Sequence, residues 1–136
     1  MKIIYEGFFV NSDIELPYTL DKDIDFRHIT TEFKPAITHE HLYGQKIRVT
    51  LISYGNDSIN EGVKVSLSSA DSDELVELFN NIAIPHITLS VSNEGKPVNT
   101  SKLDFNQPIP DNLPEVIECS FGGYIGKPIF INPMEG

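Results

Sequence analysis

The tripeptide His-Ile-Thr occurs twice in this chain, as His28-Ile29-Thr30 and as His86-Ile87-Thr88. The chain has four histidines, so half of them lie in this one local context. Both copies lie in segments typical of β-strands, where residues i and i+2 point to the same face. Each copy is therefore expected to present an imidazole and a hydroxyl side by side.

A groove between two such strands would hold two imidazoles and two hydroxyls, which suits the cleavage of a phosphodiester. Histidine titrates near neutral pH, so one ring can take a proton from the attacking oxygen while the other gives one to the leaving oxygen. Threonine hydroxyls can donate to the phosphate oxygens, where charge develops in the transition state. We expect His28 and His86 to share the acid and base roles, in either order, with Thr30 and Thr88 holding the phosphate. Such a site needs no metal and no cofactor.

The elements that must position these residues are mainly strands. Apolar patterns predict strands over residues 3–10, 27–33, 46–54, 62–68, 82–91, 115–121 and 127–131. One amphipathic helix is expected over residues 74–81, after the N-cap candidates Asp71-Ser72-Asp73. The run Gly122-Gly123-Tyr124-Ile125-Gly126 is interpreted as a bulge or tight turn between the last two strands. These elements predict an α+β fold with a largely antiparallel sheet and one or two helices, in a single domain over residues 1–136.

Four further residues are candidates for contacts with a substrate. Tyr54 and Asn56 flank a turn that could contact a base or ribose, and Lys96 could supply positive charge after the second motif. Tyr124 could stack on a nucleobase at the mouth of a cleft. The run His39-Glu40-His41 lacks a third ligand at a metal-site spacing, and it is expected to be a solvated loop.

Charge and composition narrow the classes of partner. The formal net charge is −10, with twenty acidic and ten basic residues, which argues against a basic track for long nucleic acid. No apolar run approaches the roughly 20 residues that a membrane span needs. Cys119 is the only cysteine, so no internal disulfide can form, which favours a reducing compartment and a cytoplasmic location. A monomer acting on a small nucleotide, a cyclic oligonucleotide or an RNA end is expected.

The paired motifs resemble those of the 2H phosphoesterase superfamily, whose members carry two His-x-Thr/Ser motifs. That resemblance implies a compact, two-lobed, pseudo-symmetric α+β fold in which each lobe supplies one motif to a central cleft. It also implies a phosphodiesterase that cleaves a 2′,3′-cyclic phosphate, another 2′-linked phosphodiester or a cyclic oligonucleotide, in RNA processing or in the degradation of cyclic oligonucleotide signals. His28 and His86 would be the catalytic pair, and Thr30 and Thr88 would bind the phosphate.

Two alternatives remain open at the level of sequence. The same cleft could bind a nucleotide or a phosphate without cleaving it. Otherwise the chain is a structural or interaction protein, and its strand histidines are ordinary residues bonded to the backbone. Only this last hypothesis predicts that His28 and His86 lie far apart.

Overall fold

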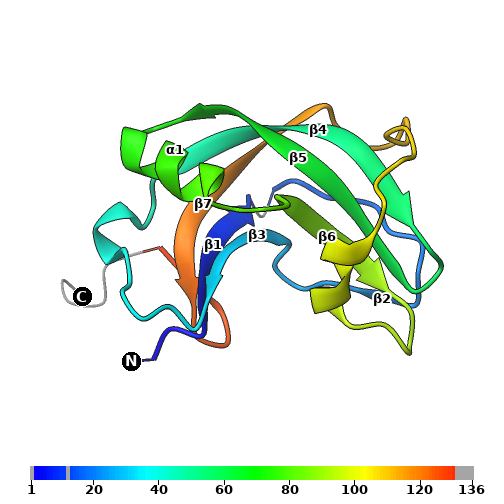
Figure 1. The fold of residues 1–136 in the computed structure, drawn as a ribbon, viewed down its shortest axis with the longest axis horizontal. Helices are drawn as coiled ribbons and strands as arrows, with labels where there is room; N and C mark the ends of the chain where they lie inside the picture. The colour runs from blue at the N-terminus through cyan, green and yellow to red at the C-terminus, as the bar shows by residue number, and fades with distance from the viewer. Residues whose placement is uncertain (1, 12, 131–136) are drawn as a thin grey trace.

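The fold is an α+β arrangement built on one mainly antiparallel sheet (Figure 1). A computed structural model describes residues 2–11 and 13–130. The elements are β1 (Tyr5–Val10), β2 (Lys22–Asp23), β3 (His28–Phe33), the 3-10 helix η1 (Glu40–Leu42), β4 (Lys46–Asn56), β5 (Asn60–Ala70), α1 (Asp73–Asn80), β6 (His86–Val91), the 3-10 helix η2 (Pro97–Lys102), β7 (Val116–Tyr124) and β8 (Pro128–Ile129). The α+β class and the largely antiparallel sheet are thus as predicted from the sequence.

The order of the strands brings the two His-Ile-Thr segments together without pairing them. The path through the sheet is β2-β6-β5-β4-β7-β1-β3, with β8 paired to β7. The motif strands β3 and β6 therefore lie at or near opposite ends of this path. The sheet curls so that Cα atoms of β3 and β6 approach within 8 Å, and no ladder joins these two strands (Figure 1).

The middle residue of each motif anchors its strand in the core. Ile29 and Ile87 are both fully buried and belong to one apolar cluster with Phe8 and Phe79. Phe79 comes from α1, whose first turn is capped by the Ser72 hydroxyl. Because side chains alternate along a strand, burial of the isoleucines directs the histidines and threonines to the other face.

The motif strands pair with two strands that also share a sequence, Glu-Gly-x-x-Val. In β1 this is residues 6–10 and in β5 it is residues 61–65. The registers match: Gly7 lies opposite Thr30, and Gly62 lies opposite Thr88. The repeat is therefore a pair of two-stranded units rather than two tripeptides.

Each unit also has a β-bulge at the same point. The β1–β3 register shifts between Glu6 and Gly7, and the β5–β6 register shifts between Glu61 and Gly62. The extra residue in each case follows the motif threonine directly on the motif strand. A β-bulge reorients the side chains beside it and interrupts the regular pairing of the two strands. In both units this interruption lies just beyond the motif threonine.

The structure corrects several details of the sequence prediction. Of the run predicted as a bulge or turn, Gly122 and Gly123 lie inside β7, where they pair with Gly7 and Glu6 of β1. The bend to β8 comes only at residues 125–127, where Gly126 has a φ of 104°. The strand predicted from residue 82 begins only at His86. The last predicted strand is reduced to β8, and residue 131 lies outside the described residues. Among the described residues, no helix is long and apolar enough to cross a membrane.

Candidate active site

All four motif side chains line one cavity of about 500 Å³ between β3 and β6. His28 and Thr30 come from β3, and His86 and Thr88 come from β6. The remaining lining residues are Tyr5, Ile24, Phe33, Pro97, Val98 and Ser101. The hypothesis of two unrelated histidines predicted that they lie far apart, and the structure contradicts it.

The two imidazoles are held in the same way. His28 Nδ1 lies 2.9 Å from the carbonyl oxygen of Phe26, and His86 Nδ1 lies 2.7 Å from that of Ile84. A carbonyl can only accept a hydrogen bond, so Nδ1 carries the hydrogen in both rings. Among the described residues neither Nε2 has a partner, so this nitrogen is the one that can exchange a proton with a bound molecule.

The environment of His28 favours its neutral form. Burial lowers the pKa of this imidazole below its usual value, and the charge of His86 lowers it further, against the opposing effect of the Phe26 carbonyl. The Tyr5 ring stacks on the imidazole at a centroid distance of 4.6 Å. A neutral Nε2 is an acceptor for a proton at neutral pH.

The threonine hydroxyls are left open by the glycines opposite them. Neither the Thr30 nor the Thr88 hydroxyl hydrogen-bonds another described group, and each threonine pairs with a residue that has no side chain. A Cβ on Gly62 would lie 2.8 Å from the carbonyl oxygen of Ile87, so the close strand pairing there requires glycine. Both hydroxyls can therefore donate to an anion in the cavity.

Arg27 connects the two motif strands across the gap. Its Nη2 donates to the carbonyl oxygen of Leu89, the residue after Thr88, at 3.0 Å. The guanidinium also lies over the ring of Tyr18 at 5.7 Å, and its Nε is buried without a described partner. Because no strand ladder spans this gap, the bond from Arg27 helps to set the separation of His28 from His86.

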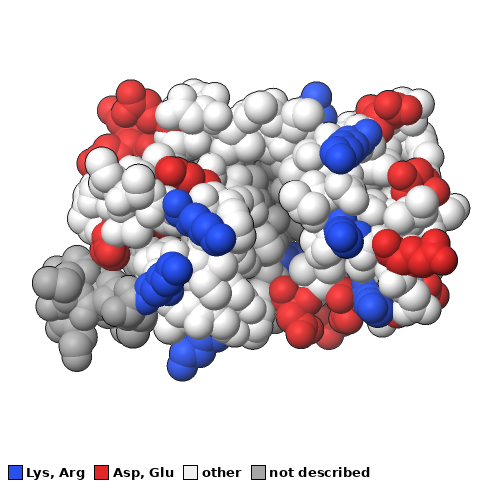
Figure 2. Space-filling model, turned by 60° about the horizontal axis from the view of Figure 1, so that its bottom comes forward, with Lys and Arg blue, Asp and Glu red and all other residues white. Residues whose placement is uncertain are grey.

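Basic residues gather around a cavity in a protein that is acidic overall. Lys34 follows β3 directly, and the exposed Lys96 and Lys102 lie at the two ends of η2, whose Pro97 and Val98 line the cavity. Figure 2 shows a hollow between the two halves of one face, with Lys and Arg side chains on both sides of it and Asp and Glu side chains at its lower end. These lysines are the groups that could attract an anionic ligand to a protein whose net charge is −10.

Two of the four further candidates lie away from this cavity. Tyr54 pairs with Val63, which pairs with Ile87, so Tyr54 shares the face of the buried isoleucine rather than that of His86. Its hydroxyl donates to the buried Glu61 and accepts from Asn56 Nδ2 at 3.1 Å. Tyr54 and Asn56 thus belong to a hydrogen-bond network on the other face.

The other two candidates lie beside the cavity without lining it. Lys96 is exposed and precedes the lining residue Pro97. Tyr124 stacks on Tyr5 at 4.8 Å and is therefore one ring away from His28. No contact with a ligand is described for either residue, so their roles remain predictions.

The histidines outside the motifs are bonded to carboxyl groups. His39 Nδ1 lies 2.9 Å from the buried Glu6, and His41 Nε2 lies 2.8 Å from Glu74. The predicted solvated loop is therefore partly wrong, since Glu40–Leu42 form η1 and His39 is tied to the interior. Within the described residues, no three His, Cys, Asp or Glu side chains are grouped to hold a metal. The Cys119 thiol is buried, which raises its pKa to about 12, so it is not a nucleophile at neutral pH.

Sequence reasoning missed the apolar rim of the cavity. Phe33 ends β3 and is 61% exposed, and Val98 in η2 is 75% exposed, yet both line the cavity. Phe33 could have been identified as a cavity residue, because it is an aromatic residue at the end of the first motif strand. Val98 had no such signal, because residues 92–114 show only turn-forming composition.

The chain was also compared with known proteins. No protein-family model matches it, and no curated protein matches its sequence significantly.

Proposed function

We propose that the chain is a phosphodiesterase of the 2H type, in which His28 and His86 carry the proton transfers. The observation that supports this is the convergence of two identical His-x-Thr pairs on one cavity, with both imidazoles fixed in the same tautomer. The repeated strand pairs, each with a bulge after the threonine, fit the pseudo-symmetric arrangement of that superfamily. The substrate classes are 2′,3′-cyclic phosphates, other 2′-linked phosphodiesters and cyclic oligonucleotides.

His28 is assigned as the base and His86 as the acid. Nε2 of His28 takes a proton from water as the water oxygen attacks phosphorus. The bond from phosphorus to the leaving ribose oxygen breaks, and Nε2–H of His86 donates its proton to that oxygen. The hydroxyls of Thr30 and Thr88 donate to the non-bridging oxygens, on which negative charge increases during the attack.

The proposal predicts a bell-shaped dependence of kcat/KM on pH. The acidic limb reports protonation of the base in the free enzyme. Since burial and the charge of His86 lower the pKa of His28, activity should persist below pH 6.5 and be lost only as the pH falls through this lowered pKa. Initial rates measured from pH 4 to pH 9 would test this. An acidic midpoint above the usual histidine value would contradict the assignment of His28 as the base.

A substrate panel tests the activity itself. The full chain is incubated with 2′,3′-cyclic mononucleotides, 2′-5′ dinucleotides and cyclic oligonucleotides, with and without EDTA, and the products are separated by chromatography. We expect cleavage of at least one class at a rate that EDTA does not change. Loss of the activity in EDTA would contradict proton transfer by two histidines alone. Binding of these ligands without turnover over long incubation would favour a nucleotide-binding module instead.

A further inference from the structure

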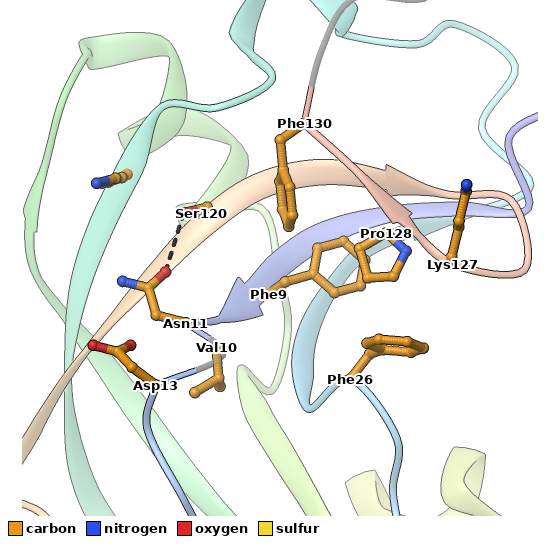
Figure 3. A pocket seen from close by; sticks show the side chains of 10 residues that line it. Phe9, Val10, Asn11, Asp13, Phe26, Ser120, Lys127, Pro128 and Phe130 are labelled. Carbon is orange, nitrogen blue, oxygen red and sulfur yellow. Dashed lines mark hydrogen bonds between the residues drawn. The ribbon is translucent and has the colours of Figure 1, made fainter.

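A second pocket, of about 600 Å³ (Figure 3), is lined by Phe9 and Phe26, and both of these residues contact His28. Three phenylalanines from separate segments form much of its wall: Phe9 of β1, Phe26 before β3 and Phe130 after β8. Figure 3 shows Phe130 and Phe26 on opposite sides of Phe9. Lys127 and Pro128 lie at one end of the pocket, and the polar residues Asn11 and Asp13 lie at the other (Figure 3).

The strand register places this pocket on the same face of the sheet as the imidazole. His28 lies opposite Phe9, Phe9 lies opposite Ser120, and Ser120 lies opposite Lys46. Directly opposed residues share a face, so this row runs across β3, β1, β7 and β4 on one side. Strands are about 4.8 Å apart, so Ser120 in the pocket is about 10 Å from His28.

Two residues that line the pocket also contact His28, the proposed base. The Phe9 ring, which is only 2% exposed, lies 5.6 Å from the imidazole of His28 and lines the pocket. The backbone carbonyl of Phe26 holds His28 Nδ1, while its side chain lines the pocket. A ligand bound at His28 therefore reaches the pocket without crossing the sheet.

The lining suits a planar, partly polar ring attached to an anion. Phe26 and Phe130 are 51% and 39% exposed and line the same pocket, so they offer a ligand a contiguous aromatic wall. Lys127 has no ion-pair partner among the described residues, whereas Lys46 lies 3.7 Å from Glu118. Asp13 disfavours a phosphate at the opposite end but can accept from the N–H groups of a base. Aromatic walls with one cation at the rim are how nucleic-acid proteins hold a single base and its phosphate.

We propose that this pocket binds the base of a second nucleotide, the neighbour of the nucleotide whose ribose carries the scissile phosphate. The preferred substrate is therefore an oligonucleotide, linear or cyclic, rather than a mononucleoside cyclic phosphate. This inference rests on the proposed phosphodiesterase activity and narrows its substrate class. Two strand spacings separate His28 from Ser120 in the pocket, a distance that one nucleotide unit spans.

The first test compares adenosine 2′,3′-cyclic phosphate with a diadenosine dinucleotide that ends in the same cyclic phosphate. Base stacking on aromatic side chains should give the dinucleotide a kcat/KM about tenfold or more higher. Phe130→Ala, Phe26→Ala and Lys127→Gln should each reduce this ratio severalfold. Ile52→Ala, which truncates an exposed apolar residue on β4, is the matched control and should keep it. A wild-type ratio near one, or an unchanged ratio in all three pocket variants, would overturn the inference.

A binding measurement separates this inference from the activity on which it rests. His86→Ala protein is titrated calorimetrically with both ligands, and the dinucleotide should bind about tenfold more tightly. Adding Phe130→Ala should remove that difference. Preferential binding by a wild-type chain that cleaves no member of the substrate panel would support the pocket and refute the phosphodiesterase. Cleavage without preferential binding would support the phosphodiesterase and refute the pocket.

Discussion

Replacing either His28 or His86 by alanine should lower kcat about 10²- to 10⁴-fold on the best substrate of the panel. Each ring supplies one of two coupled proton transfers, so removing either stops the same step. The His28→Ala/His86→Ala double variant should therefore be hardly slower than either single variant, because groups that act as a unit are not additive. Single-turnover rates of the three variants, measured at the pH optimum, test this.

Two controls separate catalysis from folding in this experiment. His41→Ala removes an exposed histidine that bonds Glu74 and lies beside the His39 ring, away from the cavity, and it should keep the wild-type rate. His86→Asn retains an amide that can donate to the Ile84 carbonyl but cannot transfer a proton, so it should be as slow as His86→Ala. If His86→Asn kept most of the activity, His86 would be a structural residue and the mechanism would be wrong.

Replacing Glu61 by alanine should cost about 3–5 kcal/mol of unfolding free energy. Glu61 is 2% exposed and accepts from the Tyr54 hydroxyl, the Ser90 hydroxyl, and both the backbone N–H and the hydroxyl of Thr19. The Tyr54 and Ser90 hydroxyls would lose this acceptor in the interior, at about 1–3 kcal/mol each. The loss of the side chain adds the cost of a cavity.

Urea denaturation measures this cost, and Glu94→Ala is the matched control. Glu94 is exposed in the turn after β6, so its removal should change the unfolding free energy by less than about 0.5 kcal/mol. Glu61→Gln keeps an acceptor and should fall between the two. Equal denaturation midpoints for Glu61→Ala and Glu94→Ala would show that the buried carboxyl network adds no stability.

The sequence predicted the orientation of the motif side chains correctly because their signal is local. Alternation along a strand is enough to place His28 beside Thr30 and to turn Ile29 inward. The Glu-Gly-x-x-Val repeat was missed because its members are ordinary in isolation. Only the strand register shows that Gly7 and Gly62 face the two motif threonines.

Pairing between strands distant in sequence also explains where the prediction from the sequence was wrong. Gly122 and Gly123 have the composition of a turn, but pairing with β1 on one side extends β7 through both of them. Nothing in the sequence around Tyr54 indicates which face of the sheet its side chain takes. The ladder that pairs Tyr54 with Val63 turns it inward. The loop residues of the cavity, such as Val98, are placed by tertiary packing that no local pattern records.

The position of the motif strands at the ends of the sheet path has a consequence for folding. The cavity exists only when the ladders β6–β5, β5–β4, β4–β7, β7–β1 and β1–β3 have all formed. Most of these ladders join segments distant in sequence, so closing them is entropically slow, and the imidazoles meet last. The proposed activity is then expected only after the secondary structure has formed, and partly folded chains with most of their strands should lack the cavity.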